Sequence, residues 1–228
     1  MNGKFKRRVL DACEAALVRH GFRRVRMHTI ALDISPDFQG WVGLNSGIYY
    51  DNVRITPAVG IHCVPLMRLV YALEERPYKI SESATFAYTL STLKKGVRPF
   101  VFMSEDDLVH EAERLASTIA QCLPFTRDFA NYEAIASISK SRSDMLGGYP
   151  EKAAVALYLM GRADEAKAWL DLQLEQFRLK EPSTFEPFEK FAAKLLHLIE
   201  TQEIRPPVSG SPSPYFDERW TYLREAYL

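Results

Sequence analysis

Residues 41–56, with the sequence WVGLNSGIYYDNVRIT, decide the fold. The stretch is rich in aromatic and β-branched residues, which suit a pleated and half-buried surface. We therefore expect two strands, at 41–46 and 48–56, joined near Gly47. Proline cannot donate to a ladder of hydrogen bonds, so Pro57 is expected to limit the second strand or to place it at a sheet edge.

Further strand-like segments flank this stretch on both sides. Residues 24–34 carry apolar side chains on both parities, which predicts one strand covered on both faces. Residues 84–93 and 97–103 are predicted to form a fourth and a fifth strand. The connections are too short for repeated crossover helices, so the simplest topology is a mainly antiparallel sheet of four or five strands.

Helical patterns come before and after the sheet. Apolar residues recur at helical spacing over residues 4–20, and Gly21 stands where a C-terminal cap belongs. Beyond residue 104 the chain is almost entirely helical. The helices expected in its last half are 126–140, 150–160, 164–180, 184–202 and 215–227. The fold class is thus α+β, with an α+β domain at 1–124 and a helical region packed on it at 125–228; a single continuous domain is the alternative.

The charge of the chain is balanced overall but uneven locally. Among its 228 residues, 29 basic and 29 acidic side chains give a formal net charge of zero, which does not favour nucleic-acid binding driven by overall charge. Residues 1–26, however, contain eight basic and only two acidic side chains. This excess indicates either a solvated helix face or a docking surface for an acidic protein or a nucleic acid.

The cellular setting is predicted from three absences in the sequence. The three cysteines are widely spaced and form no disulfide framework, which fits a reducing compartment. No signal peptide and no membrane-spanning apolar run is visible. We therefore expect a cytoplasmic protein that does not bind a membrane.

No stretch carries a recognisable catalytic, metal or cofactor motif. The phosphate-binding, dinucleotide-binding, nucleophile-elbow and zinc signatures are all missing from the sequence, so no catalytic residue, metal or cofactor is predicted. Asp33, Asp37 and Asp51 lie near predicted strand ends, where carboxylates could hold a divalent metal for nucleic-acid cleavage. No lysine lies between residues 7 and 78 to assist such a site. A metal-dependent nuclease is therefore an alternative function, beside a nucleic-acid binder that uses the basic N-terminal face.

Two resemblances bear on function. Residues 153–170, AAVALYLMGRADEAKAWL, resemble one unit of a tetratricopeptide-type helical hairpin, which implies peptide or protein binding; an ordinary helical hairpin is the alternative. A basic first helix ending in GFRR, followed by GWVGLNSGIYY and a long helix with an acidic start, resembles small bacterial immunity-type proteins that accompany toxins. That resemblance implies a non-catalytic α+β protein that inactivates a partner by binding it.

The resulting hypothesis is a non-catalytic protein-binding protein, of the immunity or antitoxin type, whose partner is another protein such as a toxin. Exposed aromatic and arginine side chains often anchor interfaces. The candidate contact residues are accordingly Trp41, Tyr49, Tyr50, Arg54, Arg23 and Arg24. Burial of the aromatic residues in the sheet core is the alternative, and the oligomeric state is not predicted.

Overall fold

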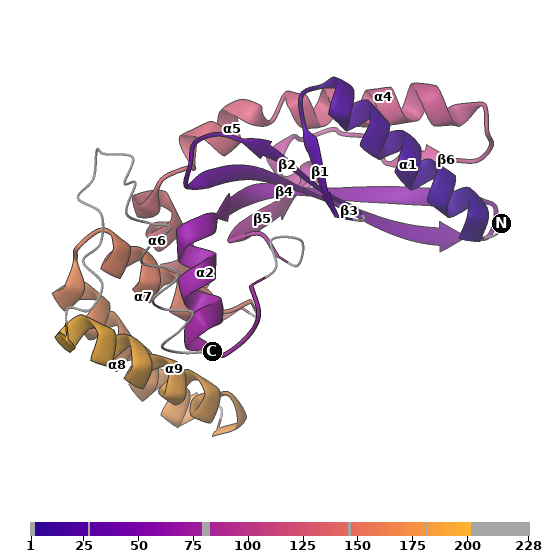
Figure 1. Ribbon diagram of the computed structural model, residues 1–228. Coiled ribbons are helices and arrows are strands. Elements are labelled where there is room, and N and C mark those ends of the chain that lie inside the picture. Colours follow the sequence, from indigo (N-terminus) through magenta and orange to yellow (C-terminus); the bar gives the residue numbers. More distant parts are fainter. Residues whose placement is uncertain (1–2, 27, 79–82, 146, 181, 202–228) are drawn as a thin grey trace. The chain divides into compact units, whose positions relative to one another are not determined.

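The computed structural model describes residues 3–26, 28–78, 83–145, 147–180 and 182–201. Its class is α+β, with an N-terminal helix, an antiparallel sheet and a helical C-terminal half, which confirms the predicted class (Figure 1). The chain forms two compact units: unit 1 comprises Met1–Cys63 and Lys79–Ala130, and unit 2 comprises Val64–Tyr78 and Asn131–Leu228. The segment that follows the longest hairpin therefore belongs to unit 2, which a single division near residue 125 did not anticipate. The helix predicted at 215–227 lies outside the described residues.

Unit 1 is built on an antiparallel sheet of six strands in the order β1-β2-β3-β4-β5, with β6 paired to β4 as well. The strands are β1 (Arg23–Arg26), β2 (Thr29–Asp33), β3 (Phe38–Tyr49), β4 (Asn52–Cys63), β5 (Phe86–Thr89) and β6 (Phe100–Phe102). The helices of this unit are α1 (Gly3–Arg19), α3 (Leu90–Leu93), α4 (Asp107–Ala120) and α5 (Leu123–Asp128). Consecutive strands pair as hairpins from β1 to β4, as short connections require.

Residues 24–34 form two strands, so the prediction of a single strand was wrong. The chain reverses between Arg26 and Thr29, which are paired across the hairpin. His28 enters the left-handed region of backbone space, with a φ of 64°, and thereby makes the reversal. The prediction that both faces of this segment are buried holds for β2, because its neighbouring residues Ile30 and Ala31 point to opposite faces and are both buried.

The central hairpin is longer than predicted. The turn falls at Tyr50 and Asp51, and Gly47 lies inside β3 opposite Arg54, so the expected break near Gly47 was wrong. Pro57 also lies inside β4, opposite Leu44. The Leu44 amide donates to the carbonyl of His28, just before β2, at 3.0 Å, so the Leu44–Pro57 pair exchanges no hydrogen bonds.

The nitrogen of Pro57 therefore faces the other edge of β4. On that edge β6 pairs with Val53–Ile55 and β5 pairs with Ala58–Ile61, which leaves a gap at Pro57. A residue without an N–H costs the sheet no hydrogen bond at this point. This is why a proline is tolerated in the middle of a central strand.

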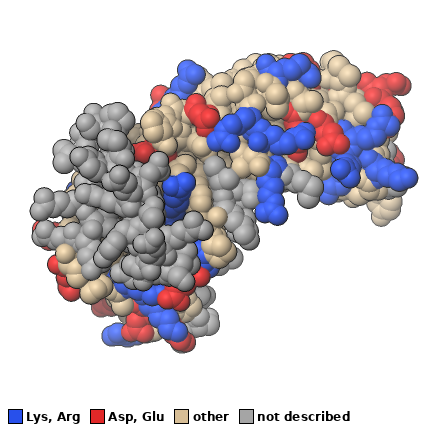
Figure 2. Space-filling model, viewed as in Figure 1, with Lys and Arg blue, Asp and Glu red and all other residues tan. Residues whose placement is uncertain are grey.

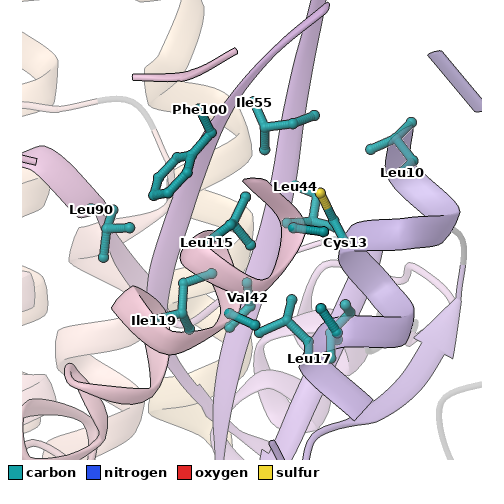
Figure 3. Close-up of a cluster of buried hydrophobic side chains, with 14 of the residues drawn as sticks. Leu10, Cys13, Leu17, Val42, Leu44, Ile55, Leu90, Phe100, Leu115 and Ile119 are labelled. Atoms are coloured by element: carbon teal, nitrogen blue, oxygen red, sulfur yellow. The ribbon is translucent and has the colours of Figure 1, made fainter. Parts of the chain in front are cut away.

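The core of unit 1 lies between one face of the sheet and helices α1 and α4. Figure 3 shows buried side chains from both helices meeting those of the strands and of α3. They include Leu10, Cys13, Leu17, Val42, Leu44, Ile55, Leu90, Phe100, Leu115 and Ile119. Because side chains alternate along a strand, the residues of opposite parity on β3 and β4 point to the other face.

Unit 2 is helical and centres on α7 (Tyr149–Leu159), which is buried on all sides from Ala153 to Leu159. Its other helices are α2 (Val64–Leu73), α6 (Tyr132–Lys140), α8 (Ala163–Lys180) and α9 (Pro182–Thr201). α7 and α8 form the hairpin expected at 153–170, and Gly161 makes the turn with a φ of 76°. No helix among the described residues has the length and apolar character needed to span a bilayer.

Candidate functional site

A pocket of about 500 Å³ lies in unit 1 between α1 and β1. One face of α1 and the strand with its following turn provide the walls. The lining residues are Gly3, Lys6, Arg7, Leu10, Asp11 and Glu14 from α1, and Arg24, Val25, Arg26 and His28 from β1 and the turn. The volume is in the range of ligand-binding pockets, and its lining is unusually rich in charge for such a site.

A buried carboxylate organises one wall of the pocket. Glu14 lies on the apolar stripe of α1, between Leu10 and Leu17, and its side chain is only 3% exposed. One carboxylate oxygen accepts the backbone N–H of His28 at 2.9 Å and lies 3.2 Å from its Nδ1. The other lies 2.5 Å from Nε of Arg24. A buried charge needs such partners, so Glu14 fixes both the arginine and the histidine in place.

The conformation of His28 depends on the same carboxylate. A residue with a β-carbon is uncommon in the left-handed region, and the conformation costs energy that its surroundings must offset. The N–H bond to Glu14 supplies that compensation. With Nδ1 beside Glu14, the other ring nitrogen, Nε2, has no partner among the described residues and is available at the pocket wall.

The remaining cations of the pocket are not neutralised internally. Arg7 and Arg26 form no ion pair or hydrogen bond with any described residue, and Lys6 reaches only the carbonyl of Ser46, at 3.3 Å. Four basic and two acidic side chains line the pocket, so its net formal charge is plus two. Figure 2 shows basic side chains gathered at the end of unit 1 where α1 begins. The arrangement suits an anion, because arginine forks match the oxygens of carboxylates and phosphates.

The two arginines predicted as contact residues lie on opposite faces of the sheet. Arg24 points toward α1 and lines the pocket. Arg23 lies on the other face, where its Nε and Nη2 donate to the two oxygens of Asp33, both at 3.0 Å. This hydrogen bonding lowers the pKa of Asp33 below its ordinary value. The structure therefore does not bring Arg23 and Arg24 into one site.

The predicted aromatic residues separate into two places along β3. Tyr50 is fully exposed at the hairpin turn, and Tyr49 beside it is 49% exposed. The guanidinium of Arg54 lies 4.5 Å from the Tyr49 ring centre. Trp41 is half-buried and about 26 Å away along the strand at 3.3 Å per residue. Its ring covers Gly43, where a β-carbon would come within 2.4 Å of the indole.

The three aspartates proposed for a nuclease site do not converge, so that prediction was wrong. Asp37 directly precedes β3, and Asp51 lies in the turn two residues after its end at Tyr49, so the twelve-residue strand, about 40 Å long, separates them. Asp33 is held by Arg23 and by Gln39. In the described part of the chain no three acidic, histidine or cysteine side chains gather as metal ligands would.

Sequence reasoning missed the residues that organise the pocket. Glu14 and His28 were not singled out, and Lys6, Arg7 and Arg26 were counted only as part of a basic segment. One signal was present: Glu14 interrupts an apolar helix stripe, at four residues from Leu10 and three from Leu17. A carboxylate at such a position requires buried partners.

A second buried charged pair lies in unit 2, at the start of α7. Nζ of Lys152 donates to the Gly147 carbonyl at 2.7 Å, and desolvation lowers the pKa of this lysine to about 8. Burial also raises the pKa of the neighbouring Glu151 carboxyl. The lysine is occupied by its own loop, so the pair contributes to the packing of α7 and defines no ligand.

Comparison with protein-family models, with curated proteins and with solved structures finds no match for this chain.

The three cysteines, Cys13, Cys63 and Cys122, are buried and free. Burial raises the pKa of the Cys13 thiol to about 12, which keeps it protonated and unreactive at neutral pH.

Proposed function

We propose that this chain is a non-catalytic binding protein that recognises an acidic partner protein through the pocket between α1 and β1. The observation that carries the proposal is the net positive charge of the pocket, with Arg7 and Arg26 left unpaired among the described residues. Unpaired arginines on two different elements can grip an acidic side chain from two sides. Charge of this kind favours association with oppositely charged surfaces and disfavours wrong partners.

A protein partner fits this charge distribution better than a nucleic acid. Nucleic-acid binders usually spread basic residues along a stripe or an entire face, because the phosphate backbone is extended. Here the unpaired cations gather at one pocket, and the chain as a whole is neutral. Binding to a nucleic acid is therefore the competing outcome of the test.

From the resemblance to immunity-type proteins we further propose that the partner is a bacterial toxin. The chain would inactivate this toxin in the cytoplasm by occupying its surface. The three free cysteines support a reducing compartment for this encounter. The exposed hairpin turn, with Tyr49, Tyr50 and Arg54, would supply a further contact surface.

The test is affinity purification of the tagged chain from a native bacterial lysate treated with nuclease. Wild type is compared with a double variant, Arg7→Glu with Arg26→Glu, and with a control, Lys95→Glu with Arg98→Glu. The control cations are exposed and unpaired among the described residues, and they lie outside the pocket. We expect one stoichiometric protein that the double variant loses and the control retains.

Two results would count against this function. Retention of the partner by the double variant would show that binding does not use the pocket. The second result compares treated with untreated lysate. If an untreated lysate yields nucleic acid whose retention depends on salt, and nuclease treatment removes all captured protein, the competing function would be established.

A further inference from the structure

The positive charge of the pocket exceeds what one acidic side chain would neutralise. An aspartate or glutamate of a partner brings one charge and two oxygens, whereas the pocket has a net formal charge of plus two. A phosphorylated side chain carries a charge of about −1.5 to −2 and three strong acceptor oxygens. We propose that the pocket receives a phosphomonoester carried by a serine or threonine of the partner protein, an inference that rests on the function proposed above.

The donors of the pocket are arranged on more than one side, as a three-oxygen ligand requires. Arg7 comes from α1 and Arg26 from β1, and both lack a partner among the described residues. Each guanidinium can donate two parallel hydrogen bonds to a phosphate group. Together the two arginines offer enough donors for the three oxygens of a phosphate group, whereas a carboxylate has only two.

Glu14 positions the other two donors without competing for the ligand. Both of its oxygens are occupied, one by Arg24 and the other by His28, and its side chain is nearly inaccessible. This carboxylate thus lies behind the donors and repels an incoming anion less than Asp11, the exposed second acid of the lining, does. The net formal charge of plus two already includes both acids. Nε2 of His28 remains at the wall and can donate only when both ring nitrogens carry hydrogen, because Nδ1–H is directed at the Glu14 carboxylate.

The volume of the pocket supports a phosphorylated side chain in a peptide context. About 500 Å³ is far more than a phosphate group alone needs, so residues next to the modified one can enter as well. Leu10 and Val25 provide apolar surface among the charged lining residues. Arginine clusters of this kind are a common means of recognising phosphorylated segments.

The test uses the full chain and three pentapeptides of the form acetyl-Ala-Ala-X-Ala-Ala-amide, where X is phosphoserine, glutamate or serine. Affinity is measured by calorimetry at low salt. We expect the phosphoserine peptide to bind at least about tenfold more tightly than the glutamate peptide, and the serine peptide not to bind. Inorganic phosphate should compete with the phosphoserine peptide.

Matched variants assign the binding to the pocket. Arg26→Gln should weaken the phosphoserine peptide by at least about tenfold, since it removes one charged pair of hydrogen bonds. Arg98→Gln, at an exposed arginine outside the pocket, should leave the affinity unchanged. Circular dichroism and thermal unfolding confirm that both variants keep the fold.

The outcomes separate this inference from the proposed function. Equal affinity for the phosphoserine and glutamate peptides, no binding of either, or an affinity unaffected by Arg26→Gln would each overturn phosphate recognition. The loss or retention of the captured partner in the double variant would still decide the proposed function. Tighter binding of a single-stranded oligonucleotide than of the phosphoserine peptide would overturn both.

Discussion

Replacing Glu14 by alanine tests how far the geometry of the pocket depends on one buried carboxylate. The substitution removes the acceptor of the His28 N–H, at 2.9 Å, and the partner of Arg24, at 2.5 Å. A hydrogen bond to a charged group contributes about 1.5–3 kcal/mol. The arginine is 54% exposed, so its ion pair is screened and adds at most about 1 kcal/mol. We expect the free energy of unfolding to fall by about 1.5–4 kcal/mol, the sum of the two contributions.

The assay is urea unfolding at pH 7, followed by circular dichroism. The control is Glu105→Ala, which breaks the 2.7 Å ion pair with Arg8. Both partners of that pair are exposed, at 48% and 62%, so its loss should cost about 0.5 kcal/mol or less. Equal effects of the two substitutions, or a loss below about 0.5 kcal/mol for Glu14→Ala, would refute the organising role of this carboxylate.

Three further predictions concern other parts of the molecule. Gly60→Ala should destabilise unit 1 by more than about 3 kcal/mol, because its β-carbon would lie 2.0 Å from the Phe86 carbonyl oxygen. Gly40→Ala, whose nearest contact would be an ordinary 3.7 Å, is the matched control in the same thermal-unfolding assay. The pKa of Lys152 is lowered to about 8 in the folded state, whereas an ordinary lysine has a pKa of 10.5. Between these two pH values the unfolded state therefore binds more protons than the folded state. Wild-type stability should therefore rise with pH across this window. Lys152→Met should remove that rise and stabilise the protein by about 1–3 kcal/mol below pH 8. Identical pH profiles of wild type and variant in urea unfolding would contradict this. Tyr50→Ala should change stability by less than about 0.5 kcal/mol, since the side chain is fully exposed, and a larger loss would mean that the hairpin turn is not a free surface.

The class of the fold was predictable because its signals are periodic. The α1 stripe and the aromatic and β-branched content of β3 and β4 each identify an element by type, whatever it packs against. The α7–α8 hairpin was predictable for a similar reason, since Gly161 lies between two helical patterns and takes the positive φ that its position requires.

The boundaries were less predictable because they depend on distant partners. Gly47 and Pro57 suggest breaks when they are considered alone, yet both lie inside paired strands. Pro57 is tolerated because two short strands leave a gap beside it, and that gap is a property of the whole sheet. The turn at His28 depends on Glu14, fourteen residues earlier in the chain.

The candidate site was predictable only in part, for the same reason. The excess of basic residues in 1–26 indicated a charged surface, and Arg24 does line the pocket. The pairing of Arg23 with Asp33 depends on strand register, which places neighbouring residues on opposite faces. No local pattern in the sequence distinguishes these two arginines.

The most direct test of the central claim is a residue-resolved NMR titration of the isotope-labelled chain with a short polyglutamate peptide. We predict that the amide signals of Lys6, Arg7, Arg24 and Arg26 shift together and that the shifts disappear in the Arg7→Glu, Arg26→Glu variant. Shifts confined to the hairpin turn around Tyr49 and Tyr50, with the signals of α1 and β1 unchanged, would contradict the assignment of the binding site to this pocket.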